Sequence, residues 1–357
     1  MKADSQIKSV KSASVLRWYD RCARQLPWRV GPAARKQGVC PDPYAVWLSE
    51  IMLQQTTVAT VTPRYLEFLE KWPTVSHMAA ASLDDVLGQW AGLGYYARAR
   101  NLHKCACVVV EQYQGKFPQT EQELLTLPGI GPYSAAAIAA IAFDKRAIVV
   151  DGNIERVVSR LFAIEDPLPK SKPIIKEIAT EFWPKNRSGD FAQALMDLGA
   201  GVCKPRNPDC KNCPLAKSCS AYDRGDPETF PRKARKKAKP TRFGHAYILV
   251  NADGDILFER RPEKGLLGGM IGLPGTDWTE TKTKKKLASA PGTAAWTRLG
   301  QARHTFTHFN LMLDVHQGKT KREPKPHEIW KKPHEVRLPT AMQKALDLAL
   351  DKNEDQP

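Results

Sequence analysis

The chain has 357 residues, and 54 Lys and Arg against 38 Asp and Glu give a formal net charge of +16. This length suffices for two hydrophobic cores, and the charge favours a polyanionic partner such as nucleic acid. The longest apolar run, Ala135 to Phe143, is too short to span a bilayer, and no secretory segment opens the chain. We therefore expect a soluble protein without membrane association, located in the cytoplasm, and at the nucleoid if the cell is bacterial.

Apolar residues recur at helical spacing through the first two thirds of the chain, with short breaks at Pro and Gly. A basic stretch follows, because seven Lys or Arg and no acid lie between Arg232 and Arg242. Such a composition cannot bury a core, so this segment is a tether, a phosphate contact or both. Compact apolar runs around an Asp253–Gly254 turn then indicate strands, before a closing helix at Met342 to Leu350. The prediction has three parts: a mainly helical domain at 11–222, a basic linker at 223–242, and a smaller α+β domain at 243–352.

Glu50 is the only charged residue in the apolar run from Ala45 to Leu53. Apolar neighbours remove solvation from a carboxyl and raise its pKa, which suits a general acid near neutral pH. The alternative is an exposed Glu on an amphipathic helix. The adjacent residues Gln54 to Thr57 carry amides and hydroxyls, which have the size and the donors to probe base edges.

The segment Leu127 to Tyr133 reads Leu-Pro-Gly-Ile-Gly-Pro-Tyr and joins two helical patterns. Gly129 and Gly131 permit a tight turn and a close approach of backbone N–H groups to an anion. Pro132 suits the first position of the next helix. Backbone amides at a helix N-terminus bind phosphate without reading base sequence, so this segment resembles a helix-hairpin-helix motif.

Asp151 follows the apolar strip Ala147 to Val150 and precedes a helical pattern that begins near Ile154. Local sequence alone is compatible with a simple helix cap or an Asp-Gly turn. The functional alternative is a carboxylate at the mouth of a cleft, kept ionised by the adjacent helix N-terminus. One carboxyl that is protonated by burial and a second that stays charged are the pair used to break glycosidic bonds.

Four cysteines lie in one segment with the spacing C-x6-C-x2-C-x5-C: Cys203, Cys210, Cys213 and Cys219. Thiolates this close can surround one metal centre. Disulfides fit less well, because the other four cysteines show no framework spacing. Tetrahedral zinc stays open, although all-cysteine zinc sites usually pair two C-x2-C units. A single C-x2-C with a lone cysteine on each side favours a [4Fe-4S] cluster, which would hold a basic loop in shape.

Five segments, in this order, resemble the MutY adenine DNA glycosylase family within the endonuclease III-like superfamily. The likeness extends from about Leu26 to Cys219 and continues more weakly to the C-terminus. It implies a two-lobed helical fold with an iron–sulfur loop, followed by a Nudix-like domain. The segments are Ser49 to Thr56, Gly92 to Arg98, the hairpin at Leu127 to Tyr133, Val150 to Asn153, and the cysteine loop.

The resemblance implies catalytic roles for four residues. Glu50 is expected to protonate the adenine at N7, and Asp151 to stabilise an oxocarbenium ion. Tyr133 and Asn153 are expected to assist near the sugar. Bifunctional relatives have a Lys where this chain has Tyr133, and without that amine no Schiff base forms. We therefore expect a monofunctional enzyme.

The resemblance also implies DNA contacts. Gln55 and Tyr95 are expected to fill the double helix when adenine is flipped out, a step that costs a few kcal/mol of unstacking, although Tyr95 could be a core aromatic. Thr56 is expected to contact DNA beside Gln55, and Gly129 and Gly131 are expected to bind the phosphate backbone.

The last domain contains Gly265 to Gly275, which resembles the opening of a Nudix-like fold, and a run from His304 to Val315 that indicates one strand. No cluster of Glu follows the first segment, so pyrophosphate hydrolysis is not expected. In the family, an aromatic–hydroxyl–His loop of this domain inspects the oxidised guanine. Phe306-Thr307-His308 matches that loop, with Thr307 where Ser is common. A second departure from the family is a loop insertion at Val30 to Cys40, which suggests no function.

Taken together, these features predict a base-excision-repair enzyme that removes adenine opposite 8-oxoguanine or guanine in double-stranded DNA. We expect it to act as a monomer, with other repair proteins as potential partners. Two alternatives remain: a thymine-mismatch glycosylase of the same superfamily, and an iron–sulfur DNA-binding module without activity. Glu50 and the C-terminal domain argue against the first, and Glu50 with Asp151 against the second.

Overall fold

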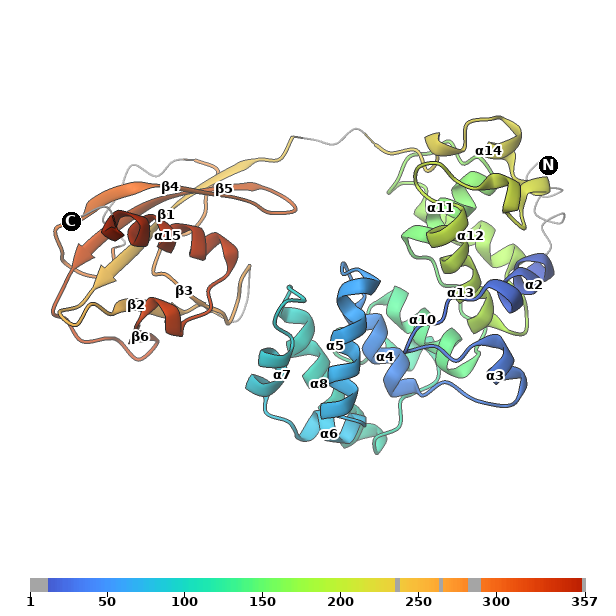
Figure 1. The fold of residues 1–357 in the computed structure, drawn as a ribbon, viewed down its shortest axis with the longest axis horizontal. Helices are drawn as coiled ribbons and strands as arrows, with labels where there is room; N and C mark the ends of the chain where they lie inside the picture. Colours follow the sequence, from blue (N-terminus) through green and yellow to red (C-terminus); the bar gives the residue numbers. More distant parts are fainter. Residues whose placement is uncertain (1–11, 235–237, 263–265, 282–289, 355–357) are drawn as a thin grey trace. The chain divides into compact units, whose positions relative to one another are not determined.

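The computed structural model describes residues 12–234, 238–262, 266–281 and 290–354 (Figure 1). The chain forms two compact units that divide between Arg235 and Lys236. Residue 11, part of the basic run at 235–237, and Gly265 lie outside the described residues. The predicted domain bounds stay a prediction, and each unit is described by itself.

The first unit is built of helices, as predicted from apolar spacing. They are α2 (Ser12–Cys22), α3 (Pro32–Lys36), α4 (Pro43–Met52), α5 (Val58–Lys71), α6 (Val75–Ala80), α7 (Leu83–Gln89), α8 (Ala97–Tyr113), α9 (Glu121–Leu124), α10 (Pro132–Phe143), α11 (Gly152–Leu161), α12 (Lys172–Phe182), α13 (Ser188–Asp197) and α14 (Ser220–Asp223). A π-helical turn occupies Leu198–Val202, and 3-10 turns occupy Cys210–Asn212, Ala216–Ser218 and Pro227–Thr229.

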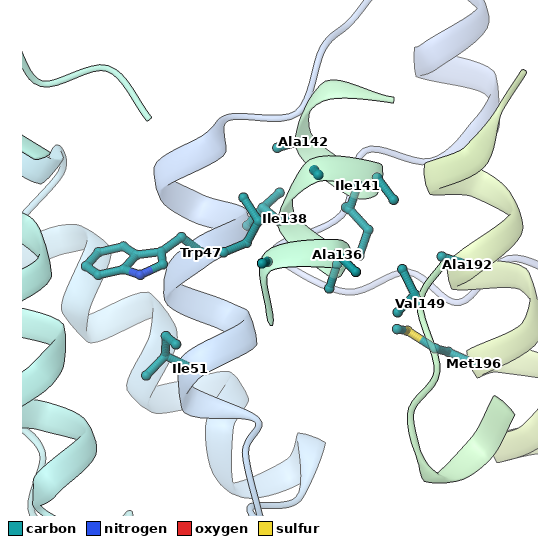
Figure 2. Close-up of a cluster of buried hydrophobic side chains, with 14 of the residues drawn as sticks. Trp47, Ile51, Ala136, Ile138, Ile141, Ala142, Val149, Ala192 and Met196 are labelled. Carbon is teal, nitrogen blue, oxygen red and sulfur yellow. The ribbon is translucent and has the colours of Figure 1, made fainter. Parts of the chain in front are cut away.

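Helix α10 lies between two groups of helices. On one side it packs against α4, which in turn contacts α5 and α8; on the other it packs against α13, which contacts α2 and α11. Figure 2 shows Trp47 and Ile51 of α4 on one side of α10 and Met196 of α13 on the other. α10 is almost entirely apolar, and its residues from Ser134 to Ala142 are all buried, so it can face both groups at once. This arrangement gives the two lobes that were predicted.

The insertion at Val30 to Cys40 contains helix α3, and Arg35 of this helix contacts both α10 and α13. Arg35 donates through Nη2 to the carbonyl of Ile141 near the end of α10, and its Nε lies 3.5 Å from Asp190 of α13. A cation near the C-terminal carbonyls of a helix is stabilising. The insertion therefore ties α10 to α13, a contact that sequence reasoning did not find.

The second unit is a six-stranded sheet with one long helix, in agreement with the predicted α+β class. The order along the sheet is β3-β2-β1-β5-β4, with β6 paired to β2, and only β1 and β5 among these described pairs run parallel. The elements are β1 (Thr241–Val250), β2 (Ile256–Arg260), β3 (Ile271–Gly272), β4 (Thr297–Thr305), β5 (Asn310–Lys319), β6 (Glu328–Lys331), a 3-10 turn (Pro333–Glu335) and α15 (Thr340–Glu354).

Two local predictions for this unit have different outcomes. The turn at Asp253–Gly254 is confirmed, because β1 and β2 pair antiparallel on either side of it. The single strand at His304 to Val315 is wrong: β4 ends at Thr305 and β5 begins at Asn310, and the two pair antiparallel. Phe306 and Phe309 are apolar like strand residues, so the sequence did not reveal the turn between them. In the fold these two rings pack against each other, with centroids 4.9 Å apart.

Helix α15 covers one face of this sheet through contacts with β1, β4 and β5. Leu346 of α15, Ile248 of β1 and Leu313 of β5 belong to the same buried cluster, so the sheet and helix share one core. None of the described helices in either unit is long and apolar enough to cross a membrane.

Candidate active site

A cavity of about 1010 Å³ lies in the helical unit, where α4, α10 and α11 meet. Glu50 comes from α4 and Tyr133 from the first turn of α10, while Asp151 and Asn153 come from the start of α11. The structure thus brings together all four residues that the sequence predicted to be catalytic. Their neighbours on the cavity wall include four further predicted DNA contacts: Gln55, Thr56, Gly129 and Gly131.

Glu50 is a buried carboxyl that accepts a hydrogen bond from Tyr133. Its side chain is 7% exposed, and Tyr133 donates from Oη to Glu50 Oε2 at 3.0 Å. Burial is the largest influence and raises the pKa of Glu50 to about 7, helped by the charge of Asp151 and opposed by Tyr133 and Arg29. A carboxyl with this pKa holds or releases a proton near neutral pH, as general-acid catalysis requires.

Asp151 is the N-cap of α11 and has more hydrogen-bond donors than Glu50. It accepts from the amide of Ile154 at 2.7 Å and from Asn153 Nδ2 at 2.8 Å. Burial raises the pKa of Asp151, while these bonds and the charge of Arg156 act in the opposite direction. Asp151 therefore caps α11 and also lines the cavity, and its catalytic role stays a prediction.

Arg156 fixes the position of Asn153, and sequence reasoning missed it. Its Nη2 donates to Asn153 Oδ1 at 2.8 Å and to the Gly199 carbonyl at 2.7 Å, and its Nε donates to the Cys203 carbonyl at 2.8 Å. A Cβ at Gly199 would lie 2.5 Å from that of Asn153, so only glycine permits this approach. One guanidinium thus joins the Asp151–Asn153 pair to the cysteine loop.

A second group missed by sequence reasoning closes the other wall of the cavity. Asp197 is 2% exposed, and its carboxylate accepts from Arg29 Nη1 at 2.8 Å and from Arg24 Nε at 2.6 Å. Arg29 also lowers the pKa of Glu50 by its charge. The partners lie more than 160 positions apart in sequence, so no local pattern could have paired them.

Gly129 and Gly131 of the hairpin line the cavity, and the helix before them is shorter than the helical pattern from Glu121 to Leu127 that the sequence predicts. α9 ends at Leu124, not at Leu127. Gly129 has φ +77°, and a Cβ there would lie 2.7 Å from Asn101, so the turn requires glycine at this position. Gly131 is the N-cap of α10 and Pro132 its first residue, which leaves the first amides of α10 available to an anion.

The four cysteines predicted to bind a cluster line one small cavity together with Arg160. Short 3-10 turns at Cys210–Asn212 and Ala216–Ser218 fold this segment around the cavity. Arg160 donates from Nη1 to Cys203 Sγ at 3.3 Å. Burial raises the pKa of Cys213 to about 12. All eight cysteines of the chain, each within the described ranges, are free thiols.

The geometry of these cysteines bears on the kind of metal that they fit. Within the described part of the chain, no three His, Cys, Asp or Glu side chains are placed to hold a metal ion. The four cysteine sulfurs line one shared cavity. Zinc draws each sulfur to about 2.3 Å from a single centre, whereas a cubane cluster holds each thiolate on a different iron. Four thiols around one cavity are chemically suited to such a cluster.

In the second unit, Thr307 and His308 lie at the exposed tip of the β4–β5 turn. The amide of Phe306 donates to the Phe309 carbonyl at 2.9 Å and closes the turn. The Phe306 ring lies 5.8 Å from that of Trp278 and anchors the base of the turn. The hydroxyl and the imidazole are therefore exposed to solvent at the tip of a turn that these contacts hold.

A family model for HhH-GPD superfamily base excision DNA repair proteins matches residues 48–185, and a NUDIX domain model matches residues 245–348. The structure of a thermostable thymine-DNA glycosylase is 29% identical with a TM-score of 0.53, and covers 62% of this chain and 98% of its own. A trapped endonuclease III–DNA covalent intermediate shares the fold at 24% identity and a TM-score of 0.51, covering 62% and 97%. The helical unit thus has the fold of helix-hairpin-helix base-excision repair proteins, and the Nudix-like prediction for the second unit is confirmed.

Sequence relatives define the family more closely. Human adenine DNA glycosylase is 36% identical and covers 85% of this chain and 66% of its own length; the mouse protein is 35% identical and covers 85% and 69%. Adenine DNA glycosylase of Buchnera aphidicola subsp. Schizaphis graminum is 31% identical and covers 95% and 98%. The chain spans about two thirds of the mammalian relatives and nearly all of the bacterial one. It belongs to the adenine DNA glycosylase family.

Proposed function

We propose that this protein hydrolyses the N-glycosidic bond of adenine mispaired with 8-oxoguanine or guanine in double-stranded DNA. The observation that carries this proposal is the pair of buried carboxyls in one cavity, with the pKa of Glu50 raised to about 7 and Asp151 held by an amide, a side-chain amide and a nearby guanidinium. Such a pair can donate a proton and support a cation at the same time. The family relationship supports adenine as the base that is removed.

In the proposed reaction, the adenine leaves the base stack and enters the cavity. Glu50 delivers its proton to N7 of the adenine, which makes the base a better leaving group. As the bond to the sugar breaks, positive charge develops on the sugar, and the Asp151 carboxylate stabilises it. Tyr133 orients Glu50 through its hydrogen bond, and Asn153 orients Asp151. Water then adds to the cationic sugar and gives its proton to the Glu50 carboxylate, which restores the acid.

The absence of an amine at Tyr133 supports a monofunctional reaction, since strand cleavage through a Schiff base requires an amine near the sugar. Borohydride trapping should give little covalent adduct with DNA, and product strands should break only after alkali. Tyr133→Lys should gain trapping. Abundant trapping by the unaltered chain would contradict this part of the proposal.

The exposed turn at Thr307 and His308 supports a role for the second unit in recognising the base opposite the adenine. A hydroxyl and an imidazole can both donate and accept hydrogen bonds. An oxidised guanine and guanine differ in their hydrogen-bond donors and acceptors, so these side chains can distinguish them. Thr307→Ala and His308→Ala should each reduce the preference for 8-oxoguanine over guanine, measured as the ratio of single-turnover rates on the two mispairs. An unchanged ratio would place this recognition elsewhere.

The cysteine loop is proposed to hold a [4Fe-4S] cluster through Cys203, Cys210, Cys213 and Cys219. Its role would be structural, because the loop contains Lys and Arg suited to phosphate contact. Purified protein should contain about four irons and four sulfides per chain and absorb in the visible range. Stoichiometric zinc in a colourless, active preparation would contradict the assignment.

The decisive experiment for the reaction is to incubate the protein with duplexes that differ only in one mispair and to identify the released base. The set includes adenine opposite 8-oxoguanine, guanine and thymine, and thymine opposite guanine. We expect free adenine from the first two. Release of thymine would favour the mismatch-thymine alternative, and release of no base would favour a DNA-binding role without catalysis.

A further inference from the structure

Two exposed residues on separate loops share an uncommon backbone conformation. Gln55, after α4, has φ 57°, and Tyr95, before α8, has φ 50°. Both residues are exposed, Tyr95 at 57%. A left-handed conformation at a residue other than glycine costs about 1–2 kcal/mol, so it persists only where neighbouring contacts impose it. Both loops therefore need a structural reason for their shape.

Arg98, in the first turn of α8, provides contacts to the first loop. Its Nη1 donates to the carbonyls of Ile51 and Met52 at 3.0 Å each, and also to the carbonyl of Gln54. The first two carbonyls lie in the last turn of α4, and the third belongs to the residue just before Gln55. A helix C-terminus carries partial negative charge, so a guanidinium at this place is favourable.

The other half of the same guanidinium reaches the second loop. Nη2 donates to the carbonyl of Leu93 at 2.8 Å and to that of Gly94 at 3.3 Å, immediately before Tyr95. It also donates to the hydroxyl of Thr56 at 3.2 Å. The guanidinium thus contacts residues on both sides of Gln55 and residues just before Tyr95.

Aromatic contacts strengthen this connection. The Arg98 guanidinium lies 5.2 Å from the centre of the Trp90 ring and 5.8 Å from that of the Tyr95 ring. Trp90 Nε1 donates to the Gly94 carbonyl at 3.0 Å, so the second loop is held from two sides. Arg98 does not line the main cavity, whereas Gln55 and Thr56 do. Any effect of Arg98 on catalysis must therefore act through other residues.

We propose that Arg98 is a positioning residue that fixes the Gln55 and Tyr95 loops to each other, so that the two tips enter the DNA helix as one rigid wedge. This inference rests on the proposed function for the identity of the flipped base. A planar guanidinium with five donors can serve both loops at once, whereas a lysine ammonium cannot span them. Preformed tips lose little conformational freedom when they displace a base, so the extrusion of adenine becomes easier.

The test uses the full chain with Arg98→Lys, which keeps the charge, and Arg100→Lys as the matched control. Arg100 lies on the same helix, and no side-chain hydrogen bond of Arg100 is found within the described residues. The measurements are the affinity for the mispaired duplex, base extrusion followed by the fluorescence of 2-aminopurine in place of the adenine, and single-turnover adenine release. We expect Arg98→Lys to lose most of the fluorescence rise and to slow release by about tenfold to a hundredfold, with affinity changed less than about threefold.

Coupling between the tips separates positioning from a general loss of structure. In the chain that keeps Arg98, the double variant Gln55→Ala/Tyr95→Ala should release adenine almost as fast as whichever single variant has the larger effect. In the Arg98→Lys chain their effects should multiply, because the tips then act separately. If Arg98→Lys does not fold, the coupling of the two alanine variants in the unaltered chain remains as the test.

Several results would overturn the inference: multiplying effects in the unaltered chain, an Arg98→Lys variant that matches Arg100→Lys in fluorescence and release, or no fluorescence rise with the unaltered chain. The proposed function fails differently. A fluorescence rise that depends on Arg98, without release of adenine, would support the wedge and contradict the glycosylase activity.

Discussion

Glu50 and Asp151 are two buried carboxyls on one cavity, and they differ in what surrounds them. Glu50 lies inside α4 and has one side-chain hydrogen bond, from Tyr133. Asp151 lies at the end of a helix and accepts bonds from the Ile154 amide and from Asn153. Burial raises the pKa of both. The comparison teaches that burial raises the pKa of both carboxyls, while the donors around each one oppose that rise, one hydroxyl at Glu50 and several groups at Asp151.

The largest expected effect comes from Glu50→Gln. The amide keeps the shape and still accepts the bond from Tyr133, but it has no proton to deliver, so single-turnover adenine release should fall by about 10²–10⁴-fold. Binding to the mispaired duplex should stay close to normal. Near-normal release by this variant would show that the acid lies elsewhere and would remove the distinction between the two carboxyls.

The same substitution should affect stability in a way that depends on pH. The pKa of Glu50 is about 7 in the folded protein against a usual 4.5, so the folded state holds a proton that the unfolded state loses between these values. Stability should therefore fall by on the order of 3 kcal/mol as pH rises through this window. Glu50→Gln lacks this loss, so its advantage in denaturant unfolding should grow from pH 5 to pH 8. A constant difference would contradict the raised pKa.

The second effect in size is expected from Asp151→Asn. Asparagine still caps α11 through its carbonyl oxygen, but the negative charge that faces the sugar is gone. Adenine release should fall by about 10²–10³-fold. Asp151→Ala serves as the comparison, because it should lose about 1 kcal/mol of helix capping in addition. If Asp151→Asn releases adenine at the normal rate, the role of Asp151 is the cap alone.

Arg156→Lys tests whether the donors around Asp151 matter as much as the charge itself. A lysine cannot reach Asn153, Gly199 and the Cys203 carbonyl together. The loss of hydrogen bonds worth about 1–3 kcal/mol corresponds to roughly a tenfold to hundredfold slower release. Arg146→Lys is the control, because Arg146 precedes α11 in the sequence and its side chain hydrogen-bonds only to the Thr180 carbonyl among the described residues. Equal rates for both variants would refute the role of Arg156.

The smallest effect is expected from Tyr133→Phe. Its hydroxyl donates to Glu50 and lowers the pKa of that carboxyl, so its removal should raise the pKa further. The decline of single-turnover release at alkaline pH should therefore shift to higher pH, while release at neutral pH changes by only about fivefold, as expected for one hydrogen bond. A shift of the profile toward lower pH would contradict the assigned contact.

Local patterns in the sequence, together with the family resemblance, were sufficient for the carboxyls and not for their supports. The isolated charge in an apolar run left both a buried and an exposed Glu50 open, and the family resemblance decided for the buried acid. Asp-Gly before a helical pattern predicted the cap at Asp151. Arg98 and Arg156 looked like ordinary helix charges, because their acceptors are backbone carbonyls on other segments. A carbonyl is present at every residue, so no residue type reveals such a contact in advance.

The helix-hairpin-helix turn and the two-unit organisation were also predictable, since Gly, Pro and changes of apolar period act locally. The turn between Thr305 and Asn310 was not, because its residues are as apolar as those of the flanking strands. The insertion at Val30 to Cys40 gave no functional signal either. Its contribution depends on Arg35 reaching Ile141 and Asp190, which only the folded chain brings near.

The pairing of Arg24 and Arg29 with Asp197 has a consequence for how the molecule is made. These contacts join positions 168 and 173 residues apart, and contacts of such separation form late because a long loop must close first. During synthesis, the segment that walls one side of the cavity must wait until Asp197 has left the ribosome. Glu50 is translated early, but the environment that tunes it is completed only when the helical part of the chain is nearly finished.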